Sequence, residues 1–286
     1  MRNADWGVAT DTGLHRDHNE DAFLARPRLF AVADGMGGHQ AGEVASAIAV
    51  AVLDRTAVLA EFTAEDVTSA VLTAHDEIAA TAAVELGRAG MGTTVTGLAV
   101  VAAGGSEHWA VFNVGDSRVY RLADGVLTQV TVDHSEVEEL VASGRLDRDQ
   151  ARSDRRRNII TRSLGSDERP LVDTWVFPPS PGEQFLICSD GLTGELSDDR
   201  IAELMLAASS AREAAAVLVA AAVEAGGHDN VTVIVVRPDD PADGAVDEDT
   251  SPRSFAVLAG DAESANPRQP AELAEPAVGP DGVAGG

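Results

Sequence analysis

Four aspartates lie at the ends of short apolar segments, and this spacing is the feature of the sequence that most favours chemistry. Asp34, Asp116 and Asp190 follow apolar runs, and Asp229 precedes one. Because strand ends are rigid, carboxylates placed there can converge at one end of a sheet assembly, where they repel one another unless a cation neutralises them. Oxygen ligands without a matching Cys or His cluster favour Mg²⁺ or Mn²⁺ over Zn²⁺. Each aspartate taken singly also fits a plain turn, so the argument depends on the set of four.

The segment Asp34-Gly35-Met36-Gly37-Gly38-His39 adds to this indication. Its glycines allow the backbone to approach a ligand closely, and such a loop can offer carbonyl oxygens to a metal. The segment directly follows an apolar strand and leads into a helical pattern, and this placement favours a ligand-binding loop over a plain flexible loop.

The elements that would position these residues are short apolar strands and amphipathic helices. One helix is expected to bury Val44, Ile48 and Val52, and a second to bury Val67, Val71, Ala74 and Ile78, because each set recurs at helical spacing. A third helix is predicted around Ile201–Ala208. The predicted strands are Leu29–Ala33, Thr94–Val101, Trp109–Val114, Val119–Leu122, Phe185–Cys188 and Val231–Val236. Strands grouped apart from helices predict sheets with helices on their outer faces, an α+β fold.

The overall composition excludes several classes of protein. A net charge of −26 argues against sequence-independent binding of nucleic acid, which requires cations to neutralise phosphates. The single cysteine, Cys188, excludes a disulfide framework and a Cys-rich zinc site, and its apolar surroundings predict a buried thiol. No apolar stretch reaches about 18 residues and no signal peptide begins the chain, so we expect a soluble, cytoplasmic protein without a membrane partner.

The composition changes near residue 238. From Pro238 to Gly286 the chain has 11 acidic residues against 2 arginines, a net charge of −9. Such a segment cannot bury enough apolar surface to offset the entropy of ordering it. We therefore predict a globular domain over residues 1–237 and a disordered acidic tail over residues 238–286. The tail is either inert and solubilising or a segment that binds a regulatory partner.

Several short motifs occur in an order that resembles one family. They are Arg16 with Asn19-Glu20-Asp21, Asp34-Gly35-Met36-Gly37-Gly38, Met91-Gly92-Thr93-Thr94, Gly115-Asp116-Ser117-Arg118, Asp133-His134-Ser135, Ser189-Asp190-Gly191 and Asp229-Asn230. Any one of them is a weak signal, but the ordered series is similar to the bacterial members of the type 2C, metal-dependent Ser/Thr protein phosphatases. The resemblance runs from about Asp5 to Val236. It implies a four-layer α-β-β-α sandwich with two central, mostly antiparallel sheets.

The resemblance also implies a centre of two or three Mn²⁺ or Mg²⁺ ions. Asp34 would bridge two of them, and the carbonyl oxygen of Gly35 would join the second. Asp190 and Asp229 would complete the first metal site. Asp116, together with Asp190, would hold the third ion found in bacterial relatives.

Other residues of the same motifs would bind through water or contact the substrate. Glu20 and Asp21 would act through metal-bound water, and Arg16 would grip the substrate phosphate, since its planar fork donates two parallel hydrogen bonds. Arg16, Asp34 and Asp190 are thus the expected catalytic residues. Metazoan relatives carry a histidine where this chain has Met36, so another acid or a metal-bound water must protonate the leaving group. His39 is a candidate for that role, or for helix capping or substrate contact.

The resemblance further implies that the polar, arginine-rich segment Thr131–Arg169 forms a flap that helps to choose substrates; a plain solvated loop is the alternative. The substrates would be proteins phosphorylated on Ser or Thr, and the enzyme, a monomer, would oppose bacterial Ser/Thr kinases. Two variants of this reading are a phosphatase of partner-switching (anti-anti-sigma) regulators and a non-catalytic pseudophosphatase. The motif Gly115-Asp116-Ser117 also mimics the nucleophile of small esterases, but the Asp-x-x-His that such enzymes need near the C-terminus is absent.

Overall fold

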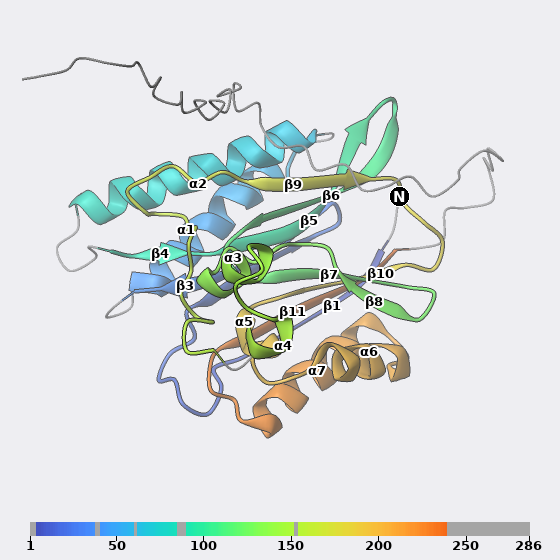
Figure 1. The fold of residues 1–286 in the computed structure, drawn as a ribbon. Helices are drawn as coiled ribbons and strands as arrows, with labels where there is room; N and C mark the ends of the chain where they lie inside the picture. The colour runs from blue at the N-terminus through green and yellow to red at the C-terminus, as the bar shows by residue number, and fades with distance from the viewer. Residues whose placement is uncertain (1–3, 38–40, 60–61, 85–89, 152–153, 239–286) are drawn as a thin grey trace, which may run out of the picture.

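Two antiparallel sheets form the centre of the protein (Figure 1). The computed structural model describes residues 4–37, 41–59, 62–84, 90–151 and 154–238. One sheet, called sheet A, has the order β1 (Ala4–Asp11), β11 (Val231–Pro238), β10 (Gln184–Cys188), β7 (Arg118–Ala123) and β8 (Val126–Gln129). The other, sheet B, has the order β2 (Asp21–Arg26), β3 (Leu29–Met36), β5 (Val95–Ala103), β6 (Ser106–Val114) and β9 (Asp173–Phe177), with the short β4 (Gly92–Thr93) paired to β3.

Side chains of alternate residues on each strand enter different hydrophobic layers. On β3, Phe30 and Val32 face the space between the two sheets, where they join Trp109 and Phe185. Leu29, Ala31 and Ala33 of the same strand face the helices that cover sheet B. This alternation follows from the two-residue period of a strand. Sheets buried on both faces explain why these strands read as continuous apolar runs in the sequence.

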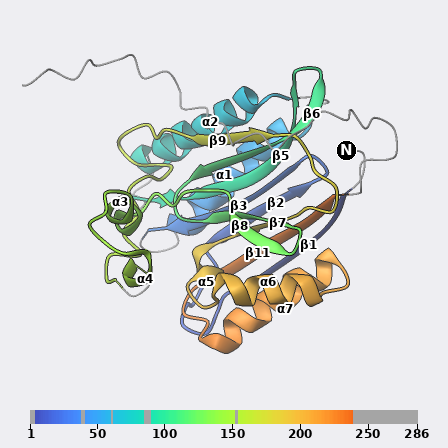
Figure 2. The same ribbon diagram turned by 45° about the vertical axis from the view of Figure 1, so that its right-hand side comes forward.

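Two helices cover sheet B and two cover sheet A, so the predicted four-layer sandwich is confirmed. Helices α1 (Ala41–Thr56) and α2 (Ala64–Val84) pack on sheet B, and α6 (Asp198–Ala207) and α7 (Ala211–Ala225) pack on sheet A (Figures 1 and 2). The helix α5 (Asp190–Thr193) follows β10 directly. The short helices α3 (Glu136–Ala142) and α4 (Arg148–Ala151) lie in the predicted flap, outside both helical layers (Figure 2).

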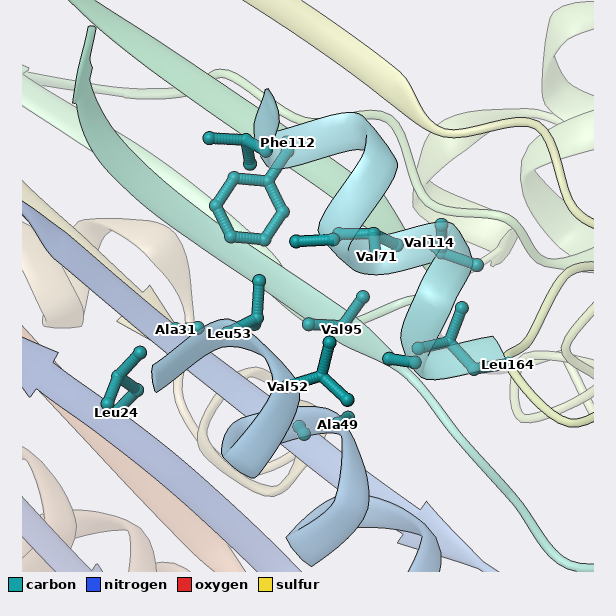
Figure 3. Packing of buried hydrophobic residues seen from close by; sticks show 14 of the residues in the cluster. Leu24, Ala31, Ala49, Val52, Leu53, Val71, Val95, Phe112, Val114 and Leu164 are labelled. Atoms are coloured by element: carbon teal, nitrogen blue, oxygen red, sulfur yellow. The ribbon is translucent and has the colours of Figure 1, made fainter. Parts of the chain in front are cut away.

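The buried face of α1 differs from the prediction. Val44 and Ile48 are only partly buried, whereas Ala45, Ala49 and Leu53 are fully buried against sheet B. Figure 3 shows Ala49, Val52 and Leu53 beside Ala31 of β3 and Val95 of β5. The burial predicted for Val52 is confirmed, whereas small side chains take the inner positions at the start of α1, where Gly42 lies in contact with Gly35 of β3. The stripe predicted for α2 is confirmed, since Val67, Val71, Ala74 and Ile78 are all buried.

No helix among the described residues is long and apolar enough to cross a membrane. The residues predicted as the tail lie outside the described part of the chain, apart from Pro238, which ends β11.

Candidate metal centre

The four aspartates lie at one end of the strands, as their positions in the sequence predict. Asp116 follows β6, Asp190 begins α5 directly after β10, and Asp229 precedes β11. The predicted end of the strand before Asp34 is wrong. Strand β3 does not end at Ala33 but continues to Met36, so Asp34 lies within the strand and is paired in register with Asp21 of β2. A strand position holds a carboxylate more firmly than a loop position, because its backbone groups are committed to the ladder.

The backbone around Asp34 is fixed by two threonines. The Asp34 amide donates to the Thr94 hydroxyl at 3.1 Å, and the Asp34 carbonyl accepts from the Thr94 amide and from the Thr93 hydroxyl, both at 2.9 Å. Thr93 and Thr94 are fully buried. These contacts hold the backbone of Asp34, while its carboxylate shares a hydrogen bond with the carboxyl group of Asp190.

Gly35 lies where helix α1 approaches strand β3 most closely. A Cβ atom on Gly35 would lie 2.3 Å from the carbonyl oxygen of Gly42 and 2.6 Å from that of Glu20. Its amide donates to the Glu20 carbonyl at 3.2 Å. Only glycine fits this crossing, so the sequence Asp-Gly is explained by packing as well as by the predicted use of a carbonyl oxygen.

Burial and mutual repulsion raise the pKa of the carboxylates of this cluster. The pKa of Asp34 lies well above its ordinary value. Burial is the largest cause of this rise, followed by the charges of Asp21, Asp190 and Asp116. Burial also raises the pKa of Asp21 to about 7. The pKa values of Asp116 and Asp190 are raised for the same reason, with additional repulsion from Asp190 and Asp229 respectively. A divalent cation bound among these carboxylates would neutralise their mutual repulsion.

The unused oxygen atoms of the cluster fit a hard divalent metal. One side-chain oxygen (Oδ1) of each of Asp21, Asp116 and Asp190 is buried and has no hydrogen-bond partner among the described residues. A buried carboxylate oxygen without a partner costs free energy, and metal coordination is one of the ways to satisfy it. In the described part of the chain, no three Asp, Glu, His or Cys side chains already converge as closely as metal ligands do. The fit therefore depends on the unpartnered oxygens and on the charge that they share.

Arg16 lies beside this cluster on the loop between β1 and β2. Its guanidinium donates to Oδ2 of Asp229 at 2.7 Å, and 49% of its side chain is exposed. Partial burial lowers the pKa of Arg16, but the bond to Asp229 and the charges of Asp34 and Glu20 outweigh it, so that the pKa is raised. A permanently charged, accessible guanidinium at the edge of a carboxylate cluster can bind a phosphate oxyanion.

Asn230 holds this loop in place. Its side chain accepts a hydrogen bond from the Glu20 amide at 2.8 Å and donates to the carbonyls of Thr12 and His18 at 2.9 Å. Ser189 makes a similar contact, because its hydroxyl donates to Oδ2 of Asp21 at 2.8 Å. Sequence reasoning included both residues in motifs but assigned them no role. Each of the two residues is adjacent in sequence to a predicted metal ligand, Ser189 to Asp190 and Asn230 to Asp229, and this adjacency could have indicated a supporting role.

A cavity of about 490 Å³ opens beside the cluster. Asp116, Asp190 and Asp229 line one side of it, and Arg148 and Asn158 of the predicted flap line another. The structure thus brings together the carboxylates, the loop of Arg16 and part of the flap. His39, which we predicted to contact substrate, lies outside the described residues.

Comparison with known proteins identifies the family. The Protein phosphatase 2C family matches residues 15–225. The serine/threonine phosphatase stp of Listeria monocytogenes is 38% identical over 244 residues, which cover 80% of this chain and 94% of that protein. The chain belongs to the protein phosphatase 2C family. The family and the α+β fold predicted from the motif series are therefore confirmed.

Solved structures of this phosphatase family have the same fold. The crystal structure of the Mycobacterium tuberculosis serine/threonine phosphatase PstP/Ppp matches with a TM-score of 0.75 at 37% identity, covering 82% of this chain and 98% of that one. The catalytic domain of PstP in complex with 2 manganese ions matches with a TM-score of 0.73 at 36% identity, covering 82% and 97%. Full-length PstP of M. tuberculosis is 38% identical over 234 residues, which cover 80% of this chain and 44% of that protein.

Proposed function

We propose that this chain removes phosphate from phosphoserine and phosphothreonine residues of proteins, with the aspartate cluster as its metal centre. The observation that carries the proposal is a cluster of buried, mutually repelling carboxylates with unpartnered oxygens beside an exposed arginine. Membership of a metal-dependent Ser/Thr phosphatase family agrees with it. Phosphate monoesters hydrolyse extremely slowly without a catalyst, so a centre that neutralises their charge is what the reaction requires.

The residues of the metal centre have distinct proposed roles. Asp34, Asp190 and Asp229, with the Gly35 carbonyl, would hold two divalent ions, Mn²⁺ or Mg²⁺. Asp116 and Asp190 would hold a third. When bound, such ions lower the pKa of a coordinated water and neutralise the phosphate for in-line attack. The chain's own contribution is to hold these carboxylates apart and oriented, as the threonine contacts of Asp34 do.

Arg16, Glu20 and Asp21 surround the metal centre and support it. Arg16 would exchange its bond to Asp229, which lines the cavity, for a bond to the substrate phosphate, since about half of its side chain is exposed. Glu20 and Asp21 would bind the metal centre through water, and their positions are fixed by Asn230 and Ser189. His39 is proposed as a substrate contact, because it follows the Asp34–Gly38 segment in the sequence.

A substitution with a matched control tests this assignment. Asp34→Asn keeps the size of the side chain but removes its charge, and we expect it to abolish hydrolysis of p-nitrophenyl phosphate and of phosphothreonine peptides in Mn²⁺ or Mg²⁺. Asp199→Asn, at an exposed position of α6 outside the flap, should keep full activity. The wild type should lose activity in EDTA and recover it with excess metal. Full activity of the wild type in EDTA would overturn the proposal.

The biological setting is also proposed. We infer that the enzyme acts in the cytoplasm as a monomer and opposes Ser/Thr kinases, whose phosphorylated targets, including kinases themselves, are its substrates. The comparison that supports this is with bacterial serine/threonine phosphatases of similar length. Phosphoproteomic comparison of cells with and without the gene tests it, and sedimentation of the purified chain tests the monomer.

The catalytic domain is proposed to span residues 1–237, and the strand β11 extends one residue further, to Pro238. Arg237 of β11 donates to the Gln184 side chain at 2.7 Å and to the carbonyls of Met205 and Ala208 at 3.1 Å. A chain truncated after Pro238 should therefore keep its stability and its activity on p-nitrophenyl phosphate. Loss of that activity would show that the acidic segment is part of the catalytic unit.

A further inference from the structure

We propose that His134 is a positioning residue that fixes the backbone carrying Asp116 and thereby sets the affinity of the third metal site. The inference rests on the proposed function, because it takes Asp116 as a ligand of that ion. It adds a specific role for the flap segment: its first residues hold one ligand of the metal centre from outside the two sheets.

His134 and Gly115 exchange hydrogen bonds. The Gly115 amide donates to Nδ1 of His134 at 3.0 Å, and the His134 amide donates to the Gly115 carbonyl at 2.9 Å. Only 5% of His134 is exposed. Each residue therefore satisfies buried backbone or ring groups of the other, and Gly115 cannot shift without leaving them unpaired.

The hydrogen bonds determine which nitrogen of the ring carries the proton. A backbone amide can only donate, so Nδ1 must accept, and the neutral ring carries its hydrogen on Nε2. Nε2 then donates to Oδ2 of Asp173 at 3.1 Å, while Arg162 donates to Oδ1 of the same carboxylate at 3.0 Å. The 3.1 Å approach of Arg162 to Nε2 is consequently a contact between two donors that share Asp173, and not a hydrogen bond. Asp173 and Arg162 thus orient the ring.

Gly115 needs this support because of its conformation. Its φ of +119° lies in the region that favours glycine, and a Cβ atom there would lie 2.5 Å from Cβ of Thr94. On its other side the chain is held by the Ser117 hydroxyl, 2.8 Å from that of Thr94. Asp116 lies between these two anchors.

The side chain of Asp116 is held by its own backbone, since its carboxylate accepts a hydrogen bond from the Asp116 amide. Its Oδ1 is buried and has no hydrogen-bond partner among the described residues. The direction of this carboxylate is therefore set by the backbone at Gly115, and through it by His134. Residues that orient metal ligands from behind typically change metal affinity roughly 10- to 100-fold when they are replaced.

Two substitutions at one position separate the halves of the His134 contact. In His134→Asn the amide oxygen lies close to the place of Nδ1 and can still accept from Gly115, but the link to Asp173 is lost. In His134→Gln the terminal amide lies close to the place of Nε2, so the link to Asp173 is kept and the Gly115 bond is lost. We expect His134→Gln to weaken the third Mn²⁺ roughly 10- to 100-fold and His134→Asn to weaken it much less.

His75 provides a matched control. It is also buried, and its Nδ1 accepts from the Gly165 amide at 3.2 Å, but it contacts none of the predicted metal ligands. His75→Gln and His75→Asn should change thermal stability without changing the number or affinity of bound Mn²⁺. The readout is Mn²⁺ binding by calorimetry and by electron paramagnetic resonance on the full chain, with circular dichroism to verify folding.

A direct measurement of the hydrogen bond accompanies the binding data. Scalar coupling across the N–H···N bond between the Gly115 amide and His134 Nδ1 should be visible by NMR in the wild type. If His134→Gln does not fold, Asp173→Ala, which leaves the ring in place without its orienting partner, should still weaken the third ion while the first two bind normally.

Each outcome has a clear meaning. Unchanged Mn²⁺ binding in His134→Gln, or an equal loss in His134→Asn, overturns the positioning role, because the Gly115 bond would then not matter. A wild type that binds no Mn²⁺ overturns the proposed function instead. In that case the NMR coupling still reports whether the His134–Gly115 contact exists.

Discussion

Replacing Asp21 by asparagine is expected to stabilise the metal-free protein while it weakens the metal centre. Burial of the carboxylate is the main reason that the pKa of Asp21 rises from 3.8 to about 7; hydrogen bonds from Thr232 and Ser189 oppose the rise, and repulsion from Asp190 and Asp229 adds to it. Asparagine has nearly the same shape and can still accept the Ser189 hydroxyl, but it carries no charge. The substitution therefore removes an unfavourable charge and little else.

The size of the effect follows from the shift in pKa. A folded-state pKa about three units above the unfolded value costs roughly 4 kcal/mol at a pH above both values. Oδ1 of Asp21 is buried, but the residue as a whole is partly exposed, so solvent screening reduces this figure. About 2 kcal/mol is the appropriate scale, which corresponds to an increase in Tm of roughly 4–8 °C.

The pH dependence gives the prediction its sign. The pKa of Asp21 is higher in the folded state than in the unfolded state. The contribution of protonated Asp21 to the stability of the wild type is therefore fully present below pH 3.8 and is lost as the pH rises to about 7. The advantage of Asp21→Asn should therefore be absent near pH 4, grow between pH 4 and 7, and stay constant above that range.

Thermal unfolding followed by circular dichroism in EDTA, from pH 4 to pH 8, measures this effect. Asp167→Asn at an exposed position serves as the control and should not change Tm. With excess Mn²⁺ the difference in Tm between Asp21→Asn and the wild type should become smaller or change sign. A ligand at a hundred times its Kd stabilises the folded state by about 2.7 kcal/mol, and the variant binds Mn²⁺ less well. A variant that melts at or below the wild-type Tm in EDTA at pH 8 would refute the reasoning.

Three further predictions concern the buried framework. The thiol of Cys188 is fully buried and burial raises its pKa to about 12, so it should react with a disulfide reagent only when the protein unfolds, as absorbance at equilibrium in urea would show. Gly7→Ala places a Cβ atom 2.3 Å from the Ala211 carbonyl and should cost about 3 kcal/mol in urea unfolding, because backbone must move; Gly104→Ala has open space and should cost about 1–2 kcal/mol for its positive φ alone. Trp109→Phe removes the 2.7 Å bond from the indole to buried Glu183 and should cost about 1–3 kcal/mol, and a change below 0.5 kcal/mol, on the order of surface substitutions, would contradict this.

The positions of the chemical residues could be predicted because they depend on local pattern. Asp116 and Asp190 follow apolar runs of strand length and Asp229 precedes one, and the structure places all three at one end of the sheets. The extension of β3 through Asp34 could not be read in the same way. Asp and Gly disfavour strands, and the pairing of Asp34 with Asp21 and of Gly35 with Thr93 depends on partners distant in sequence.

Strand β1 and helix α7 were not predicted, because neither has a regular hydrophobic pattern in the sequence. Strand β1 has one buried residue, Gly7, among exposed and half-buried ones, and it is stabilised by its pairing with β11, which lies more than two hundred residues away. Helix α7 is rich in alanine and has no stripe of large residues, yet a signal was present: Ser210 accepts from the Glu213 amide at 3.1 Å, and Glu213 accepts in turn from the Ser209 amide at 2.7 Å. This is close to a capping box, and Ser followed three residues later by Glu can be recognised in a sequence.

The buried face of α1 shows a limit of hydrophobic periodicity. Val44 and Ile48 form a helical stripe, but the helix turns its alanines inward because Gly42 and Gly35 lie in contact. A close approach between two glycines on different elements is invisible in a pattern that ranks residues by hydrophobicity. The same contact holds Asp34 and Gly35 against the helix, so the error in the predicted core and the position of the candidate site have one cause.

The candidate centre joins the two sheets. Asp34 belongs to sheet B, Asp190 and Asp229 adjoin strands of sheet A, and Asp116 lies where the chain passes from β6 of sheet B to β7 of sheet A. Repulsion among these carboxylates therefore acts across the sandwich, between Asp34 and Asp190, as well as within each sheet, between Asp34 and Asp21 and between Asp190 and Asp229. A cation between them would remove that repulsion and connect the sheets at this end, while Phe30, Trp109 and Phe185 already hold them together through the hydrophobic layer farther along the strands. Metal binding at this centre should therefore be linked to the stability of the folded chain, because a bound cation would stabilise the contact between the two sheets at this end.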